Sequence, residues 1–173
     1  MLEQLGLAPA LRQLVTRFRS AYPAKVKLNV GRLGPLTKKT EVLIYRLVQE
    51  CLNNVAKHSS CTTVSISVDA TDEWLRLEVH DDGVGFCPEE ALKKTGSFGL
   101  SGIRERVALM GGECTVRSRR ADPARQGRQS TGTQVRIDLP LRNVTGADEL
   151  LRQPERYLAD QPDRPKQREF VNR

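Results

Sequence analysis

The sequence predicts an α+β fold, a two-layer α/β sandwich in which a mixed β-sheet carries helices on one face. Three observations support this prediction. Short segments with alternating apolar residues are interspersed with longer segments whose apolar residues recur every three or four positions. Each predicted strand has a single apolar face, as expected for a sheet covered on one side. The 173 residues are also enough for one domain with a sizeable core.

The first two elements precede the central helix. Residues 5–18 have apolar side chains at helical spacing, and Pro9 lies near the start, where a helix tolerates it. Residues 25–30 alternate as a short strand. A segment containing Gly and Pro, residues 31–35, leads out of this strand. A helix followed by a strand is therefore expected at this end of the fold.

The central element is a predicted helix over residues 40–58. Thr40 is its expected N-cap, and Ser59 and Ser60 mark its expected end. Its apolar residues recur at intervals of three and four, and they are Ile44, Leu47, Val48, Cys51, Leu52 and Val55. This spacing predicts one buried face for the helix.

Three polar residues lie at one edge of that buried face. Glu50, Asn54 and His58 follow each other at four-residue spacing, so they stack along the helix. A carboxylate, a carboxamide and an imidazole in such a row can line the wall of a cleft. A solvated polar edge is the alternative interpretation, and the helix taken alone favours this alternative.

The remaining elements complete the sheet. Residues 64–68 and 75–79 alternate around a turn-like segment, residues 70–73, and predict a hairpin. A helical face follows Phe98 and ends at the glycine pair 111–112. The last two alternating segments are 114–118 and 134–139. The predicted order is helix, strand, helix, hairpin, helix and two strands.

Domain organisation follows from where the apolar residues stop. Residues 1–141 are expected to form one domain. In residues 142–173 apolar side chains are sparse, and Pro154, Pro162 and Pro165 interrupt any helix. This segment is expected to be a disordered tail.

Composition excludes several classes of protein. No run of about 18 apolar residues exists, so no membrane-spanning helix is expected. The N-terminus lacks the basic and then apolar pattern of a signal peptide. Four scattered cysteines without a CxxC pair fit a reducing cytoplasm better than a disulfide framework.

The net charge of +7 is concentrated in residues 117–128. This segment contains no aromatic residue on which a base could stack. A solvated basic loop is therefore favoured over nucleic-acid binding.

Two segments have the chemistry of a nucleotide site. The carboxamide oxygen of Asn54 is a hard ligand suited to Mg²⁺, which binds through few protein oxygens together with phosphates and water. Asp81 at a strand end can accept a hydrogen bond from an exocyclic amine such as adenine N6. Gly83 and Gly85 would let the backbone approach a flat ring. Alone, a DDGVG segment is most often an ordinary turn.

Two glycine-containing segments add to these. Gly96, Gly99 and Gly102 lead into a helix whose first amides can bind phosphate. An ordinary flexible loop has the same composition, so the feature is weak alone. Residues 131–133, Thr-Gly-Thr, precede the last strand and would otherwise be an unremarkable turn.

In this order and spacing, the four segments resemble the N, G1, G2 and G3 boxes of the GHKL ATPase superfamily. That superfamily holds the ATP-binding folds of gyrase, Hsp90, histidine kinases and MutL. The resemblance is closest to sensor histidine kinases that work with LuxR-type response regulators, the nitrate-sensor and hexose-phosphate-sensor subgroup. The residues that carry it are 45–50, Asn54, Lys57, His58, 99–106 and 111–112. It covers roughly residues 2–141.

The resemblance implies a Bergerat-type ATP-binding fold with ATP and Mg²⁺ as cofactors. Asn54 is similar to the Mg²⁺ ligand of the N box. Glu50 matches the acidic residue that orders the metal and its waters or polarises the attacking group. These two residues would be the catalytic pair. The phosphate region would be edged by Asn53, Lys57 and His58, although a polar contact at the helix end is an equal alternative for His58.

The other boxes imply the rest of the nucleotide site. Asp81 is similar to the adenine-binding aspartate, with Gly83 and Gly85 giving the ring its room. Thr133 would support the adenine side near Asp81. Residues expected to present amides to the phosphates are Gly99 and Leu100, and residues 86–98, starting with Phe86, would form a mobile lid over ATP.

One departure from the family pattern implies a partner. The family's phosphoacceptor histidine lies upstream in a dimerisation helix pair, next to an acidic residue. This chain contains only His58 and His80, and neither has that setting. The chain is therefore identified as the catalytic half of a kinase, with residues 2–7 at the junction. A dimerisation domain, through which it would form homodimers, is expected as one partner.

The expected function is transfer of the ATP γ-phosphoryl group to a histidine on that separate domain, with a LuxR-type response regulator downstream. The expected location is the cytoplasm, and any membrane anchor would lie in segments not present here. No nucleic-acid or membrane partner is expected for this chain. Two alternatives use the same boxes: a serine kinase of the anti-sigma-factor type, and a nucleotide-gated binding module without kinase activity.

Overall fold

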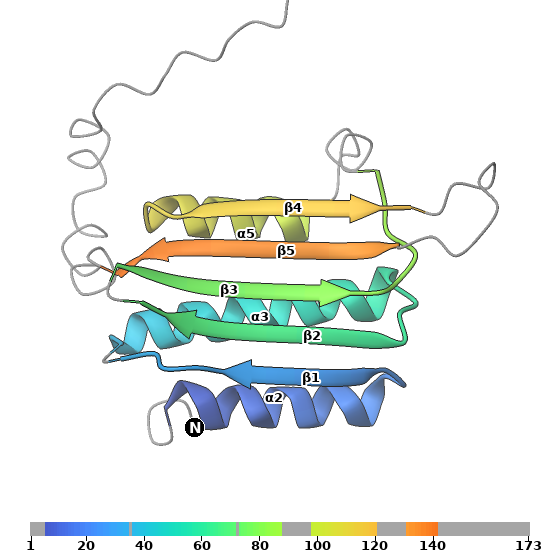
Figure 1. The fold of residues 1–173 in the computed structure, drawn as a ribbon, viewed down its shortest axis with the longest axis horizontal. Helices are drawn as coiled ribbons and strands as arrows, with labels where there is room; N and C mark the ends of the chain where they lie inside the picture. Colours follow the sequence, from blue (N-terminus) through green and yellow to red (C-terminus); the bar gives the residue numbers. More distant parts are fainter. Residues whose placement is uncertain (1–5, 35, 72, 88–97, 121–130, 142–173) are drawn as a thin grey trace, which may run out of the picture.

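The computed structural model describes residues 6–34, 36–71, 73–87, 98–120 and 131–141. In chain order, the elements are α2 (Leu7–Ala21), β1 (Lys25–Val30), α3 (Lys38–His58), β2 (Thr63–Ala70), β3 (Trp74–Asp81), α5 (Phe98–Leu109), β4 (Glu113–Arg119) and β5 (Gly132–Pro140). Figure 1 shows the strands side by side in one sheet. The observed order of helices and strands confirms the predicted order.

The sheet is mixed, and its strands lie in the order β1-β2-β3-β5-β4. β1 runs parallel to β2, and α3 connects them. The other neighbouring pairs are antiparallel. β5 therefore lies between β3 and β4, which places Thr133 directly opposite both Asp81 and Ser118.

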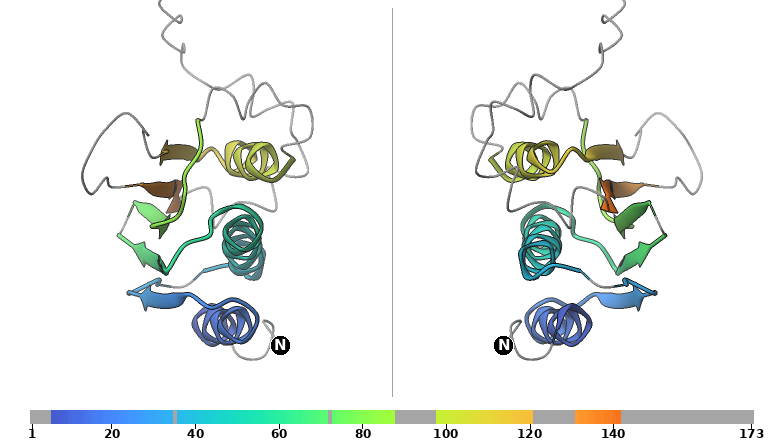
Figure 2. Two further views of the ribbon diagram at one scale, coloured as in Figure 1. Left: turned by 90° about the vertical axis from the view of Figure 1, so that its right-hand side faces the viewer. Right: turned by 90° about the vertical axis from the view of Figure 1, so that its left-hand side faces the viewer.

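The three helices of the described residues, α2, α3 and α5, cover the same face of the sheet, as the end-on views in Figure 2 show. α3 lies behind the middle of the sheet, α2 beside β1, and α5 beside β4. The buried stripe of α3 contains the six apolar residues predicted for it, each at most 4% exposed. They pack against the inward residues of the central strands, which include Val64, Ile66, Val68, Leu75, Leu77, Val79, Ile137 and Leu139. The two-layer sandwich is confirmed.

The opposite face of the sheet carries polar side chains. Arg76 of β3 donates a hydrogen bond to Asp138 of β5 at 2.6 Å, and Arg136 donates to the same carboxylate at 2.7 Å. Arg136 also lies 3.9 Å from Glu78. Among the described elements, no helix covers this face of the sheet, as Figure 2 shows.

The start of α3 differs from the prediction. The helix begins at Lys38, and Thr37 is its N-cap, with its hydroxyl accepting a hydrogen bond from the Thr40 amide at 3.3 Å. The Thr40 side chain is buried and lies 2.9 Å from the Thr37 hydroxyl. Thr40 is therefore inside the first turn, and its assignment as N-cap was wrong because both threonines have the side chain that a cap requires.

Two sequence expectations lie outside the described residues: the disordered tail over 142–173 and most of the lid over 86–98. The first helix begins at Leu7 and runs to Ala21, three residues beyond its predicted end. Among the described helices, none has the length and apolar character needed to cross a bilayer.

Candidate functional site

The candidate site lies at the edge of the sheet where β3 and β4 end and β5 begins, beside the C-terminal end of α3 (Figure 1). Asp81 is the last residue of β3, and its side chain is only 5% exposed. Its Oδ1 atom accepts hydrogen bonds from the Ser59 hydroxyl at 2.6 Å and from the Gly83 amide at 3.0 Å. Among the described residues, none donates to Oδ2. Asp81 therefore has one oxygen held by the protein and one available to a ligand.

The adjacent Asp82 is occupied entirely by the protein. Its Oδ1 accepts the amides of Thr62 and Thr63, each at 2.8 Å, and its Oδ2 accepts the Thr62 hydroxyl at 2.7 Å. Burial raises the pKa of Asp82, but these hydrogen bonds outweigh that effect and hold the pKa below its ordinary value. Asp82 thus fixes the start of β2, which leaves Asp81 as the ligand-binding candidate of the pair.

Both glycines of the loop after β3 are required by contacts within the protein. A Cβ on Gly83 would lie 1.9 Å from the Ser59 hydroxyl oxygen. Gly85 has a φ of +62°, and a Cβ there would lie 2.1 Å from the Arg119 carbonyl oxygen. On these sides the space is filled by protein atoms. The role of both glycines in making room for a ring stays a prediction.

The other wall of the site is formed by β4 and β5. The Thr133 and Ser118 hydroxyls are 2.9 Å apart, and Ser118 also accepts the Phe86 amide at 2.9 Å. Gly132 has a φ of +127°, and a Cβ there would lie 2.0 Å from the Asp81 carbonyl oxygen. Thr133 consequently lies beside Asp81 on the helix-facing side of the sheet, where the sequence places it.

The second part of the site joins α3 to the start of α5. A Cβ placed on Gly99 would lie 2.8 Å from Glu50 Oε1 and 2.9 Å from Asn54 Oδ1. Two oxygens from successive turns of α3 therefore converge on one point at the first turn of α5. The N-terminal turn of a helix carries unpaired amides and partial positive charge, which suits the negative charge of Glu50 and of a phosphate.

The donor set fits Mg²⁺. Asn54 Nδ2 is buried and has no hydrogen-bond partner among the described residues, so this amide is held in place without being used by the fold. A carboxylate oxygen and a carboxamide oxygen are ligands that Mg²⁺ accepts, and it takes its remaining ligands from phosphates and water. Among the described residues, His, Cys, Asp and Glu form no cluster of three that could hold a metal ion.

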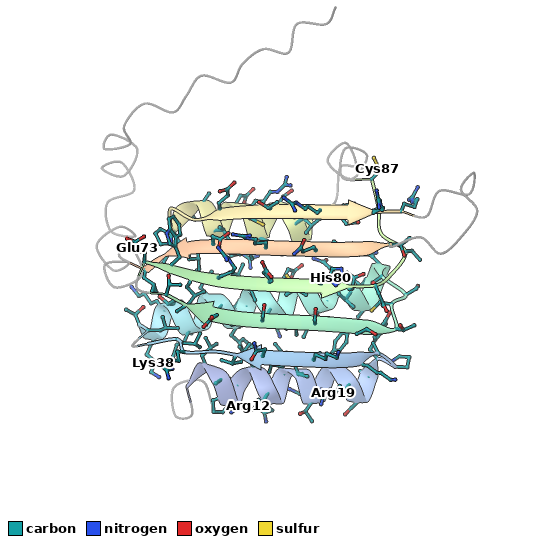
Figure 3. The ribbon with its side chains drawn as sticks, in the orientation of Figure 1. Arg12, Arg19, Lys38, Glu73, His80 and Cys87 are labelled. Atoms are coloured by element: carbon teal, nitrogen blue, oxygen red, sulfur yellow. The ribbon has the colours of Figure 1, made fainter. Side chains whose placement is uncertain are left out.

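The remaining predicted residues lie around these two parts. On α3, the residues Asn53, Lys57 and His58 are exposed. The side chain of Leu100 packs against the core, so only its backbone is a candidate for phosphate contact. Figure 3 shows His80 on β3. His80 is exposed, whereas its neighbours Val79 and Asp81 are buried against the helices, so it lies on the opposite face of the sheet from the site.

Ser59 and Ser118 were not predicted as site residues. From the sequence, Ser59 was expected only at a helix end and Ser118 only in a strand. Ser59 is the C-cap of α3 and donates to Asp81, and Ser118 joins Thr133 to Phe86. Serine is common at helix ends and in strands, and each of these serines meets its partners only through the fold. The sequence carried no signal for Ser59, whose burial at 7% exposure is a property of the fold.

Comparison with known families gives one match that covers most of the described chain. The family described as histidine kinase-, DNA gyrase B- and HSP90-like ATPase matches residues 39–143. The matched range begins in α3 and contains every residue discussed above for the site.

Similar proteins include several named kinases. The sensor histidine kinase ComP of Bacillus subtilis is 38% identical over 117 residues, which are 67% of this chain and 15% of ComP. The signal transduction histidine-protein kinase/phosphatase DegS of the same organism is 35% identical, over 81% of this chain and 35% of DegS. The sensor histidine kinase NarS of Mycobacterium tuberculosis is 34% identical, over 82% and 31%. The chain thus spans about a third of these relatives or less.

Solved structures agree with the sequence comparisons. The blue-light activated histidine kinase of Erythrobacter litoralis EL346 aligns with a TM-score of 0.59 and 27% identity, over 78% of this chain and 42% of that one. The mycobacterial sensor histidine kinase MprB aligns with a TM-score of 0.54 and 25% identity, over 76% of this chain and 93% of that one. The fold is therefore that of histidine kinase ATPase domains.

Proposed function

This chain belongs to the family of histidine kinase-, DNA gyrase B- and HSP90-like ATPases, and on that premise we propose that it is the ATP-binding catalytic domain of a two-component sensor histidine kinase. It would transfer the γ-phosphoryl group of ATP to a histidine on a separate dimerisation domain. The observation that carries this proposal is the convergence of the Glu50 and Asn54 oxygens on the first turn of α5, on the helix-covered side of the sheet where Asp81 also lies.

At the base end of the site, Asp81 would accept a hydrogen bond from adenine N6. Its Oδ2 is available for this bond because the protein donors end at Oδ1. Val84 in the same loop is 51% exposed, so this loop also offers an apolar side chain to a ligand. Thr133 supports this wall through its hydroxyl contact with Ser118.

At the phosphate end, Asn54 and Glu50 would hold Mg²⁺ against the nucleotide. A bound Mg²⁺ supplies neutralisation of the charge that shifts among the phosphate oxygens during transfer. The first amides of α5, at Gly99 and Leu100, would orient the phosphates, because the amides at a helix start have no intrahelical acceptor. Lys57 is exposed one turn beyond Asn53 and can add positive charge near the same phosphates.

The acceptor histidine in this proposal lies outside the chain. His58 is anchored on the same helix as Asn54, so it cannot move into line with the γ-phosphate independently of the metal ligands. His80 lies on the opposite face of the sheet, next to the residue proposed to bind adenine. Phosphoryl transfer requires the acceptor nitrogen in line with the γ-phosphate and close to it, and neither histidine meets this requirement.

Partners and location follow from the same proposal. The relatives ComP, DegS and NarS have names that describe histidine kinases, which favours a histidine over a serine as the acceptor. We therefore propose a dimerisation domain carrying that histidine, homodimerisation through it, and a LuxR-type response regulator downstream. ATP in the cytoplasm would be the phosphoryl donor, which places the domain in that compartment.

Calorimetric titration with ADP tests the nucleotide site. Asp81→Asn should weaken ADP binding by about tenfold or more, because an amide can turn a donor toward the adenine amine and a hydrogen bond to a charged group is lost. Asp69→Asn, an exposed position at the far end of β2, is the matched control and should leave binding unchanged. Wild-type affinity in Asp81→Asn would remove the adenine assignment.

A further inference from the structure

Ser59 is not among the residues that the family resemblance assigns to the nucleotide. It nevertheless forms a direct hydrogen bond with Asp81, the residue proposed to bind adenine. Resting on the proposed function, we infer that Ser59 is a positioning residue that fixes the Asp81 carboxylate and thereby sets the selectivity of the site for a 6-aminopurine over a 6-oxopurine. Adenine nucleotides belong to the first class, and hypoxanthine nucleotides belong to the second.

Ser59 is held at the junction between α3 and the loop after β3. As the C-cap of α3, it donates its amide to the Val55 carbonyl oxygen at 3.0 Å, and its own carbonyl accepts the Val84 amide at 2.8 Å. Its hydroxyl donates to Asp81 Oδ1 at 2.6 Å, between two side chains that are 7% and 5% exposed. Two backbone hydrogen bonds therefore hold Ser59 in place while its hydroxyl donates to the buried Asp81 carboxylate.

The close packing around Ser59 is built into the loop. A Cβ on Gly83 would lie 1.9 Å from the Ser59 hydroxyl oxygen and 2.8 Å from Asp81 Oδ1. The absence of a side chain at Gly83 therefore lets both groups and the Gly83 amide come together. Cys61 lies on the other side of the hydroxyl. Burial and the Asp81 charge raise the pKa of the Cys61 thiol, while hydrogen bonding with Ser59 and Tyr22 opposes that rise.

This arrangement determines which atoms of a base can form a hydrogen bond with Asp81. With Oδ1 fixed by two donors, Oδ2 has one position, and an ionised carboxylate only accepts hydrogen bonds. The 6-amino group of adenine is a donor and fits that position. The 6-oxo group of hypoxanthine is an acceptor and would face the carboxylate oxygen. Its N1–H is a donor, but Asp81 could reach N1–H only by rotating away from Ser59.

Without the Ser59 hydroxyl, the Asp81 carboxylate should be able to rotate. Only the Gly83 amide would then hold Oδ1, and the carboxylate could turn toward either base edge. The inference therefore predicts a change in the ratio of two affinities. A purely structural role for Ser59 would instead lower both affinities together.

The experiment is calorimetric titration of the full chain with ADP and with IDP, which differ only at positions 6 and 1 of the purine. Wild type should prefer ADP. Ser59→Ala should lose about tenfold in ADP affinity, as expected for one hydrogen bond to a charged group, with IDP affinity changed less than about twofold. Ser67→Ala on the open face of β2 is the matched control and should leave the ratio unchanged.

Ser59→Cys serves as a second variant where Ser59→Ala does not fold, because a thiol keeps the shape of the side chain and is a weak donor. The ratio of ADP affinity to IDP affinity in Ser59→Cys should also be lower than in wild type. An ADP-to-IDP ratio equal to that of wild type in the folded variant, or an equal loss for both nucleotides, would overturn the inference and leave the proposed function intact. Equal binding of ADP and IDP by wild type would also overturn it. Failure of wild type to bind ADP at all would instead refute the proposed function, and the inference with it.

Discussion

Two adjacent aspartates, Asp81 and Asp82, have different roles in this protein. Both carboxylate oxygens of Asp82 accept hydrogen bonds at the start of β2, whereas Asp81 Oδ2 has no donor among the described residues. The difference arises from strand alternation, which turns Asp81 toward the helices and the Ser59 hydroxyl. At the scale of single residues, position on the strand decides which carboxylate belongs to the fold and which to a ligand.

Asn54→Ala separates metal-dependent chemistry from folding. Because Asn54 Nδ2 has no partner among the described residues, its removal should leave the melting temperature nearly unchanged. Phosphoryl transfer to a supplied acceptor domain should fall by roughly 10- to 100-fold or more, with a smaller effect on ADP affinity. Asn29→Ala on the exposed face of β1 is the control. Equal losses of ADP binding and transfer would indicate that Asn54 supports the fold.

Cys51 should be unreactive in the folded protein. Burial, with smaller contributions from Cys114 and Glu50, raises the pKa of the Cys51 thiol to about 12. Since the thiolate is the nucleophile, iodoacetamide at pH 8 should spare Cys51 in the native protein and modify it in urea. Peptide mass spectrometry reads out the site. Modification at the same rate in both conditions would show that Cys51 is not shielded.

The sequence made Asp81 and Asn54 candidate site residues because their residue types and order match a known set of boxes. It could not identify Ser59, because the partner of its hydroxyl lies 22 residues away and is brought close only by the pairing of β2 with β3. The convergence of Glu50 and Asn54 on Gly99 was likewise invisible, since it depends on how α5 packs against α3.

At the scale of elements, α3 organises the site. Its apolar stripe holds it against the sheet, its polar edge carries Glu50 and Asn54, and its C-cap holds Asp81 through Ser59. Factors that shift the helix along its axis would therefore move both ends of the nucleotide site together.

The N-cap of α3 should contribute measurably to stability. Thr37→Ala should lower the free energy of unfolding by about 1 kcal/mol, because the Thr40 amide loses its acceptor. Thr37→Ser should retain most of the stabilisation, because serine also provides a hydroxyl acceptor. Thr16→Ala on the exposed side of α2 is the control and should be neutral or slightly stabilising, since alanine is the better helix former. Urea denaturation gives the three values, and an unchanged midpoint for Thr37→Ala would contradict this cap assignment.

The bounds of the first strand were predicted more closely than the start of α3. Residues 25–30 were found with their observed bounds, because period-two alternation is imposed by a sheet with one buried face. The start of a helix depends on which hydroxyl meets which amide, and Thr37 and Thr40 both carry a hydroxyl at the start of α3. Local pattern therefore predicted the elements but did not decide which of these two threonines caps the helix.

At the scale of the whole molecule, the open face of the sheet is tied by ion pairs between β3 and β5. Burial raises the pKa of Asp138, but hydrogen bonds from Arg136 and Arg76 outweigh it and hold the pKa below its ordinary value. A carboxyl with a depressed pKa in the folded state stabilises the protein above the unfolded pKa. This stabilisation is lost as the pH falls through the folded pKa.

Asp138→Asn should accordingly destabilise the protein at pH 7 and converge with wild type in acid. The difference in the free energy of unfolding should shrink as the pH falls from about 4 through the lowered pKa of folded Asp138, because position 138 is then uncharged in both proteins. Urea denaturation at several pH values measures it. Glu105→Gln, an exposed position on α5, makes the same charge change and is the control. A difference that stays constant from pH 7 to 2.5 would exclude the ion pairs as its cause.

The central claim is that this chain donates a phosphoryl group to a histidine that it does not contain. The most direct measurement is incubation with γ-labelled ATP, alone and with a separate dimerisation domain that carries its own histidine. We predict no label on the lone chain and acid-labile label on the added domain, reduced by Asn54→Ala. Label on the lone chain that disappears in His58→Ala or His80→Ala would contradict the claim, as would an added domain that stays unlabelled while the chain binds ATP.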